Sequence, residues 1–315
     1  MRSVMNVIWN LTRFCPWACR FCCMNAFYCA NAAGPKSKEH LAIKCKELSF
    51  DEKLVVVRQF TETDFSVDFS GGDPLFFPED LRVVREATKL LPKERISVST
   101  TGIEFGMEKV ELLQNVDLAK FTLDTLPETE NPWRPSGFHA CSLTALELCS
   151  RHGVATQAVT TLYPLTMTKD NLTRVYEKLC AIGVTSWELL RFYPVGRAFN
   201  QRHLEPSIDD YLRVMDFVRG FQGSTRIMFQ HSLRMLEENE SCMAGNRTLG
   251  ILPDGQVVAC AWALDGYAQP AHEYLSLGYV PTVHVSEIAA IAVKEATFRL
   301  GAHGYRCAHC GVRSK

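Results

Sequence analysis

The first two-thirds of the chain alternates short apolar runs with longer amphipathic segments, and this pattern constrains the fold more than any other feature. The short runs have the length of buried strands, and the longer segments have the periodicity of helices. The six predicted strands are Val4–Trp9, Ser66–Ser70, Ile96–Thr100, Ala119–Leu123, Ala155–Leu162 and Trp187–Phe192. Because parallel neighbours need a crossover connection, this order predicts an α/β protein with a parallel sheet.

Helix signals lie between the predicted strands. Ser49 before Glu52 is typical of a capping box, and Gly183 is typical of a helix C-terminus. The predicted helices include Leu81–Leu91, Ser142–His152, Leu172–Ala181 and Ile208–Phe221. No dinucleotide fingerprint follows the first strand, so a partial (β/α)6 barrel fits better than a doubly wound sheet. In such barrels the chemistry gathers at the C-terminal ends of the strands.

The pattern changes after about residue 223. A turn at Pro253, Asp254 and Gly255 separates two short apolar runs, which predicts a β-hairpin, and a helix is predicted over Val285–Leu300. We therefore expect two domains, a barrel over residues 1–223 and a smaller domain over residues 224–315, with the boundary near residues 223–240.

Charge and hydropathy limit the partners. The chain has 34 Lys and Arg against 35 Asp and Glu, so no net field favours nucleic acid or an anionic membrane. No run approaches the ~20 apolar residues of a membrane span, and Val4–Leu11 is too short and polar for a signal peptide. We expect a cytoplasmic protein that binds neither nucleic acid nor membranes. In that reducing compartment, closely spaced members of the 13 cysteines indicate metal ligands rather than disulfides.

Three cysteines, Cys15, Cys19 and Cys22, directly follow the first predicted strand. Three thiolates on a four-iron cluster leave one iron open to a second molecule, as catalytic metal sites generally do. A zinc site is the alternative, because Cys23 or Cys29 can supply a fourth ligand.

The spacing of these cysteines at the end of a first barrel strand resembles the radical S-adenosylmethionine (SAM) superfamily. The resemblance implies that Cys15, Cys19 and Cys22 hold a [4Fe–4S] cluster and that Phe21 lies against the adenine of SAM. A reduced cluster of this family cleaves SAM to a 5′-deoxyadenosyl radical, which removes a hydrogen atom from an unactivated carbon. The cofactor supplies the reactivity, and the protein aims it and excludes water.

Further segments at strand ends support the resemblance. The segment Ser70–Pro74 is similar to the family's GGEP motif, with Asp73 where glutamate is usual, although the same residues also make a good turn. Thr101 lies in a segment similar to the family's third-strand motif, or in a simple strand-ending turn. The resemblance implies that the SAM-binding residues are Gly71, Gly72, Asp73, Pro74, Thr101, Asp124 near the ribose, and Arg191 at the methionine carboxylate. Arg191 can equally form a structural bridge between the two predicted domains. The segment at Arg134 is similar to one in SPASM-type enzymes, and the sequence assigns no role to it.

The late cysteines Cys242, Cys260, Cys307 and Cys310 form a second group around the predicted hairpin. They are similar to the SPASM and twitch extensions of radical SAM enzymes, in which a hairpin and helix hold an auxiliary Fe–S cluster, most often [4Fe–4S]. The chain ends at Lys315 without the longer cysteine run of a full SPASM domain, so the resemblance implies a twitch domain with one auxiliary cluster. A four-cysteine zinc ribbon is the alternative.

The resemblance implies hydrogen-atom abstraction but leaves the substrate open. One hypothesis is maturation of a peptide by oxidation, cross-linking or epimerisation, although a first strand at about Val4 leaves no room for a leader-binding domain. The same chemistry on a small polar metabolite, an aminocyclitol or sugar, is a second hypothesis, and a non-catalytic Fe–S or zinc protein is a third. Epimerisation needs a hydrogen-donating thiol, for which Cys23, Cys29 and Cys45 are candidates. Flavodoxin or ferredoxin is the expected electron donor.

Overall fold

The computed structural model describes residues 5–237 and 242–303. Within these residues the core is a curved ten-stranded sheet in the order β12-β11-β10-β1-β4-β5-β6-β7-β8-β9. The strands are β1 (Asn6–Thr12), β4 (Ser66–Gly71), β5 (Ile96–Thr100), β6 (Leu118–Thr122), β7 (Thr156–Leu162), β8 (Ser186–Arg191), β9 (Arg226–Phe229), β10 (Thr248–Ile251), β11 (Gln256–Val258) and β12 (Ser276–Tyr279). The run from β10 through β1 to β9 is parallel throughout, whereas β11 pairs antiparallel with both β10 and β12.

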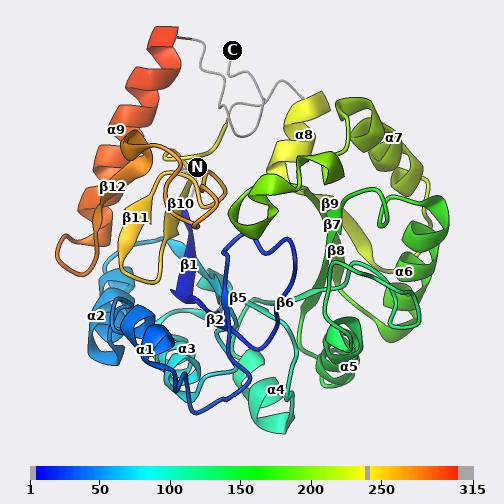
Figure 1. The fold of residues 1–315 in the computed structure, drawn as a ribbon, viewed down its shortest axis with the longest axis horizontal. Helices are drawn as coiled ribbons and strands as arrows, with labels where there is room; N and C mark the ends of the chain where they lie inside the picture. The colour runs from blue at the N-terminus through cyan, green and yellow to red at the C-terminus, as the bar shows by residue number, and fades with distance from the viewer. Residues whose placement is uncertain (1–4, 238–241, 304–315) are drawn as a thin grey trace.

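Helices cover the outer side of this sheet, and the loop that follows β1 crosses its inner side (Figure 1). The helices are α1 (Lys38–Lys44), α2 (Phe50–Thr61), α3 (Pro78–Leu90), α4 (Met107–Leu113), α5 (Phe138–Arg151), α6 (Lys169–Ile182), α7 (Ile208–Arg219), α8 (His231–Glu237) and α9 (Val285–His303). The short strands β2 (Phe14–Cys15) and β3 (Phe27–Tyr28) pair with each other inside the loop. None of the described helices is long and apolar enough to cross a membrane.

The helix-capping residues predicted from the sequence lie at helix ends in the structure. The Ser49 side chain accepts from the Glu52 backbone and the Glu52 carboxylate accepts from the Ser49 backbone, so the predicted capping box begins α2. Gly183 ends α6 in the left-handed conformation. These caps fix the helices at the register in which their apolar faces meet the sheet.

The two faces of the sheet differ in chemistry because successive strand residues point to opposite sides. Val7, Trp9, Val67 and Phe69 are fully buried in the main apolar core, which the outer helices share. The alternate positions face inward and are more polar, among them Asp68 beside Val67. The inner side of the barrel is thus a partly open polar space, closed at one end by the loop after β1.

The predicted fold class is confirmed: the protein is α/β, with a parallel sheet and the order of strands and helices expected from sequence. Two features differ from expectation. β9, within the expected boundary region, adds a further parallel strand next to β8. The C-terminal hairpin joins the barrel sheet directly, because β10 pairs in parallel with β1 from Asn6 to Trp9. Helix α9 packs against β12 and α2. The division into two domains stays a prediction.

Candidate active site

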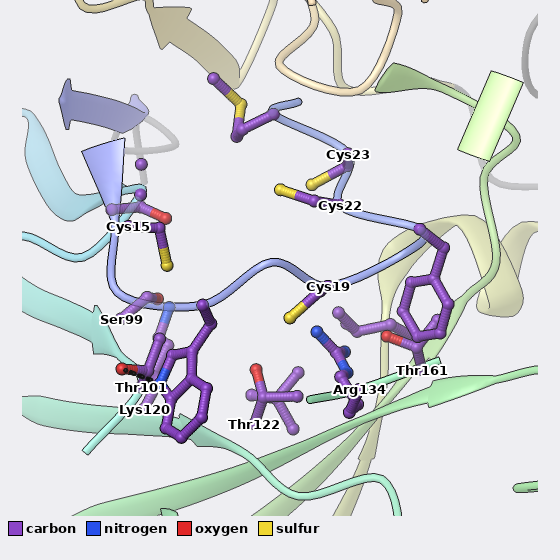
Figure 2. Close-up of a pocket in the computed structure, with 18 of the residues that line it drawn as sticks. Cys15, Cys19, Cys22, Cys23, Ser99, Thr101, Lys120, Thr122, Arg134 and Thr161 are labelled. Carbon is purple, nitrogen blue, oxygen red and sulfur yellow. Dashed lines mark hydrogen bonds between the residues drawn. The ribbon is translucent and has the colours of Figure 1, made fainter. Parts of the chain in front are cut away.

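The loop from Phe14 to Tyr28 carries the three early cysteines across the C-terminal ends of the strands. Cys15 and Cys19 are buried, and the sulfurs of Cys15, Cys19 and Cys22 face a common cavity of about 230 Å³ (Figure 2). We call it the cysteine cavity; strand-end residues such as Thr122 and Thr161 line the side opposite the loop.

The donor set fits an iron–sulfur cluster. Each thiolate of such a cluster binds a different iron, so the ligands must surround a space rather than meet at one point. Three thiols of one loop around a single cavity have this arrangement. In the described part of the chain, no group of three or more histidine, cysteine, aspartate or glutamate side chains is placed to hold a single metal ion.

Two glycines let the turn after β4 lie against the cysteine loop. A Cβ on Gly72 would lie 1.8 Å from the Phe14 carbonyl oxygen, and one on Gly71 would lie 2.7 Å from the Thr12 carbonyl oxygen. Gly71 also has a φ of +123°, which disfavours any side chain. The Gly72 N–H donates to the Thr12 carbonyl at 2.8 Å. Both glycines line the cysteine cavity, as the resemblance implies, so their backbone is available to a ligand.

Asp73 lies behind this wall rather than in it. Its carboxylate accepts from the Leu75 N–H at 2.9 Å, the Thr100 hydroxyl at 2.9 Å and the Thr101 N–H at 3.0 Å. Neither Asp73 nor Pro74 lines the cavity, whereas Thr101 does. Asp73 therefore acts on the site by joining the turn after β4 to the turn after β5.

Asp124 also lies behind the wall, and Arg134 takes the position at the cavity. The Asp124 carboxylate accepts from Arg134 Nε at 2.6 Å and from the Thr161 N–H at 2.9 Å. Burial raises the pKa of Asp124, but Arg134 and then His139 more than offset this and lower the pKa to about 2. Arg134 lines the cavity and hydrogen-bonds Cys19, whose pKa burial raises while Arg134 opposes the rise. Asp124 itself does not line the cysteine cavity, and its expected place near the ribose stays a prediction.

An aromatic group surrounds Phe21. Its ring meets Tyr163 edge-on at 5.1 Å and Phe192 at 5.8 Å, and the Arg134 guanidinium lies 4.5 Å from its centre. Phe21 and Phe192 both line the cysteine cavity. The rings meet edge to face, so Phe21 and Phe192 give the cavity apolar wall surface in two orientations.

The end of β8 and the segment that follows it contact the cysteine loop. Of these residues, only Arg191 was expected from the sequence to belong to the site. Arg191 is buried, lines the cysteine cavity and reaches Glu205 with an Nη2 to Oε1 distance of 3.4 Å. A Cβ on Gly196 would lie 2.2 Å from the Cys23 carbonyl oxygen, and the Arg197 N–H donates to the Cys22 carbonyl at 3.0 Å. A glycine a few residues after a strand was the only sequence signal for this contact.

A second cavity of about 340 Å³ lies deeper inside the barrel, and we call it the barrel chamber. Cys23, Met24, Lys120, Tyr193 and Trp262 line both cavities, and the rings of Tyr193 and Trp262 stack at 5.4 Å. Cys242 and Cys260 line the barrel chamber. Cys307 and Cys310 lie outside the described residues.

The three candidate hydrogen donors lie in different places. Cys23 lies where the two cavities meet, and burial, followed by the charge of Cys22, raises its pKa to about 12. Cys29 is packed in an apolar cluster with Phe14, Phe76 and Phe77. Cys45 is exposed at the end of α1. Neither Cys29 nor Cys45 lines the cysteine cavity or the barrel chamber.

Comparison with known proteins adds to the geometry. Streptococcus suis SuiB bound to its precursor peptide SuiA superposes with a TM-score of 0.67 at 13% identity, covering 100% of this chain and 70% of that one. SuiB bound to S-adenosylmethionine gives 0.64 at 12% identity and 82% coverage of this chain. anSMEcpe with bound AdoMet gives 0.61 at 16% identity, covering 98% of this chain and 88% of that one.

These likenesses show the fold. In the SAM-bound form, the match spans only 60% of the SuiB chain. No curated protein matches the sequence. The sequence model of the radical SAM superfamily matches residues 9–179. Because this match covers more than half of the chain and includes Cys15, Cys19, Cys22 and the turn after β4, the chain belongs to the radical SAM superfamily.

Proposed function

We propose that this protein is a radical SAM enzyme that removes a hydrogen atom from a carbon of a peptide. The observation that carries the proposal is that two cavities adjoin: the cysteine cavity suits the cofactors, and Cys23 and Tyr193 line both this cavity and the barrel chamber. A reactive species made in the first cavity is therefore formed next to a substrate in the second.

In this proposal the residues of the cysteine cavity bind the cluster and SAM. Cys15, Cys19 and Cys22 hold the [4Fe–4S] cluster, with one iron left for SAM. When bound, the reduced cluster and SAM supply a 5′-deoxyadenosyl radical. The carbonyls of Gly71 and Gly72 accept from the methionine ammonium, and Arg191 pairs with its carboxylate.

Other residues orient the cofactor and the substrate. Phe21 and Phe192 pack against the adenine, and Asp73 keeps Thr101 at the cavity. Asp124 holds the Arg134 guanidinium next to Cys19. Trp262, from the C-terminal part, stacks on Tyr193 where the two cavities meet.

The C-terminal part is proposed to be a twitch domain over residues 224–315 with an auxiliary Fe–S cluster. Cys242 and Cys260 line the barrel chamber, which supports a role close to substrate. With Cys307 and Cys310 as further ligands, such a cluster would accept one electron from the substrate radical that remains after hydrogen abstraction, so that the substrate becomes oxidised. A flavodoxin or ferredoxin in the reducing cytoplasm stays the predicted electron donor.

A peptide is the preferred substrate because SuiB, which has the same fold, is described in complex with a precursor peptide. The reaction type depends on Cys23. If its thiol returns a hydrogen atom to the substrate radical, the product is an epimer; if the radical loses an electron, the product is oxidised. Incubation in deuterated water separates the two, because only the epimer carries deuterium at the inverted carbon.

The first prediction tests the radical chemistry itself. Protein reconstituted anaerobically with iron and sulfide and reduced with dithionite should form 5′-deoxyadenosine from SAM, measured by liquid chromatography. Cys19→Ala should lower this rate by more than about 100-fold, because loss of a direct cluster ligand should cost more than loss of an outer-shell partner. Cys180→Ala, on α6 outside both cavities, is the matched control and should keep the wild-type rate. Intact SAM in the wild-type reaction contradicts the proposal.

A further inference from the structure

Three charged residues lie on the inner face of the barrel, in the middle of strands rather than at their ends. Asp68 is on β4, Lys120 on β6 and Glu188 on β8, and all three line the barrel chamber. Charged side chains inside a sheet are unfavourable unless a partner offsets the loss of water. Each therefore needs a partner in the protein or in a ligand.

Two of the three charges neutralise each other. Lys120 Nζ lies 2.8 Å from Asp68 Oδ2, and the Ser99 hydroxyl donates to Asp68 Oδ1 at 3.1 Å. Burial lowers the pKa of Lys120, but the attraction of Asp68 outweighs this and raises it above its ordinary value. Lys120 is thus held as a cation by Asp68 and is not available to an anionic ligand.

Glu188 differs from both. No hydrogen bond or salt bridge joins its carboxylate to another residue of the described ranges, 5–237 and 242–303, and the side chain lines the barrel chamber but not the cysteine cavity. Burial raises its pKa, Lys120 opposes the rise without cancelling it, and the negative charge of Asp68 adds to the rise. Arg234, the other cation that acts on it, lies on α8 beside His231 and does not line the chamber.

Within the part of the chain that the structure describes, the chamber therefore presents at its wall one acidic group, Glu188, that has no hydrogen bond or salt bridge to the protein. Its volume of about 340 Å³ is in the range of small-ligand pockets. A cation placed there recovers the electrostatic free energy that burial of the carboxylate loses, whereas an anion increases that loss.

We propose that the barrel chamber recognises its substrate through a primary ammonium or guanidinium group that pairs with Glu188. This inference rests on the proposed function and names the chemical class of the substrate. The carbon that loses its hydrogen then lies between the cation and the junction at Cys23 and Tyr193, several bonds from the charge.

The deciding experiment measures binding of two probes of equal length, n-hexylamine and hexanoate, to the reconstituted full-length protein by calorimetry. Wild type should bind the amine at least about tenfold more tightly than the acid. Glu188→Gln should remove this preference, and Glu188→Lys should reverse it. The exposed Glu177→Gln on α6 is the matched control and should keep it.

Iron content and the visible spectrum check that each variant has folded. If Glu188→Lys fails this check, Asp68→Asn supplies the second test, because it frees Lys120 to pair with Glu188 and should lower the amine affinity. Equal binding of both probes by wild type, absence of binding, or an unchanged preference in Glu188→Gln overturns the inference.

Turnover then identifies the source of the cation. Acetylated pentapeptides with central lysine, norleucine or glutamate are compared with glucosamine and glucose as stimulators of 5′-deoxyadenosine formation. Stimulation by the lysine peptide assigns the cation to a peptide, and stimulation by glucosamine assigns it to an amino sugar; norleucine or glucose acting equally well contradicts the inference. A protein that forms no 5′-deoxyadenosine contradicts the proposed function instead, while the probe preference still tests Glu188.

Discussion

The cysteine cavity and the barrel chamber share a wall but are built differently. The first is made of loops at the ends of strands, where Gly71, Gly72 and Gly196 let backbones meet without side chains between them. The second is made by side chains in the middle of strands, among them Asp68 and Glu188. Backbone contacts are insensitive to most side-chain changes, whereas mid-strand side chains can be replaced one at a time. In terms of the proposed function, the difference indicates that the cofactor end, at the cysteine cavity, is fixed, and that the substrate end, at the barrel chamber, is adjustable.

The largest effect is expected at the cofactor end, from Gly72→Ala. The added Cβ would lie 1.8 Å from the Phe14 carbonyl oxygen, so the cysteine loop has to move. We expect a loss of more than about 4 kcal/mol in the free energy of unfolding, together with loss of iron binding. Urea unfolding and iron content measure the two effects.

Gly106→Ala is the matched control for this variant. A Cβ at Gly106 meets no atom within 4 Å, so stability and iron content should stay at wild-type levels. Normal iron loading by Gly72→Ala would show that the cysteine loop is adjustable, and the contrast between the two cavities would not hold.

An effect of intermediate size on stability is expected when the charge of Asp124, which lies behind the cysteine cavity, is removed. The pKa of Asp124 is about 2 in the folded protein against 3.8 ordinarily, so it contributes about 2 kcal/mol of stability. Because the folded pKa is the lower one, this stability is present above pH 4 and is lost as the pH falls towards 2. Asp124→Asn should have a lower free energy of unfolding at pH 7, because it lacks this contribution. Its stability should also fall less than that of wild type between pH 4 and pH 2, as measured by urea unfolding.

The exposed Asp170→Asn on α6 is the control, and it should keep the wild-type pH profile. If Asp124→Asn also keeps that profile, Asp124 does not stabilise Arg134, and the supporting role assigned to it is wrong.

The sequence predicts the cofactor end well because its signals are local. The six barrel strands lie where apolar runs predict them, and Cys15, Cys19, Cys22 and the turn at Gly71 follow strand ends directly. The resemblance also led to the cavity-lining residues Phe21, Thr101 and Arg191. It did not separate residues that line the cavity from residues that support it, since Asp73 and Asp124 differ from them only in which way the side chain turns.

The chamber was missed for another reason. Asp68, Lys120 and Glu188 come from β4, β6 and β8, alternate strands of the sheet whose side chains meet at one chamber only after folding, and no motif contains them. A signal was present, because each is a charged residue with apolar neighbours in the middle of a strand. β9 was missed because a strand of four residues gives too little periodicity to detect. The pairing of β10 with β1 depends on contacts almost the whole chain apart.

The smallest effect sharpens the assignment of Arg191, which lies at the cofactor end but is also tied to Glu205. Arg191→Lys keeps the charge and loses the planar fork that pairs bidentately with a carboxylate. We expect the Kd for SAM, measured by equilibrium binding to reconstituted protein, to rise about tenfold, or about 1.4 kcal/mol. Arg213→Lys on the exposed side of α7 should leave it unchanged. A lower unfolding free energy with an unchanged Kd would assign Arg191 to bridging, and the methionine carboxylate would then need another partner.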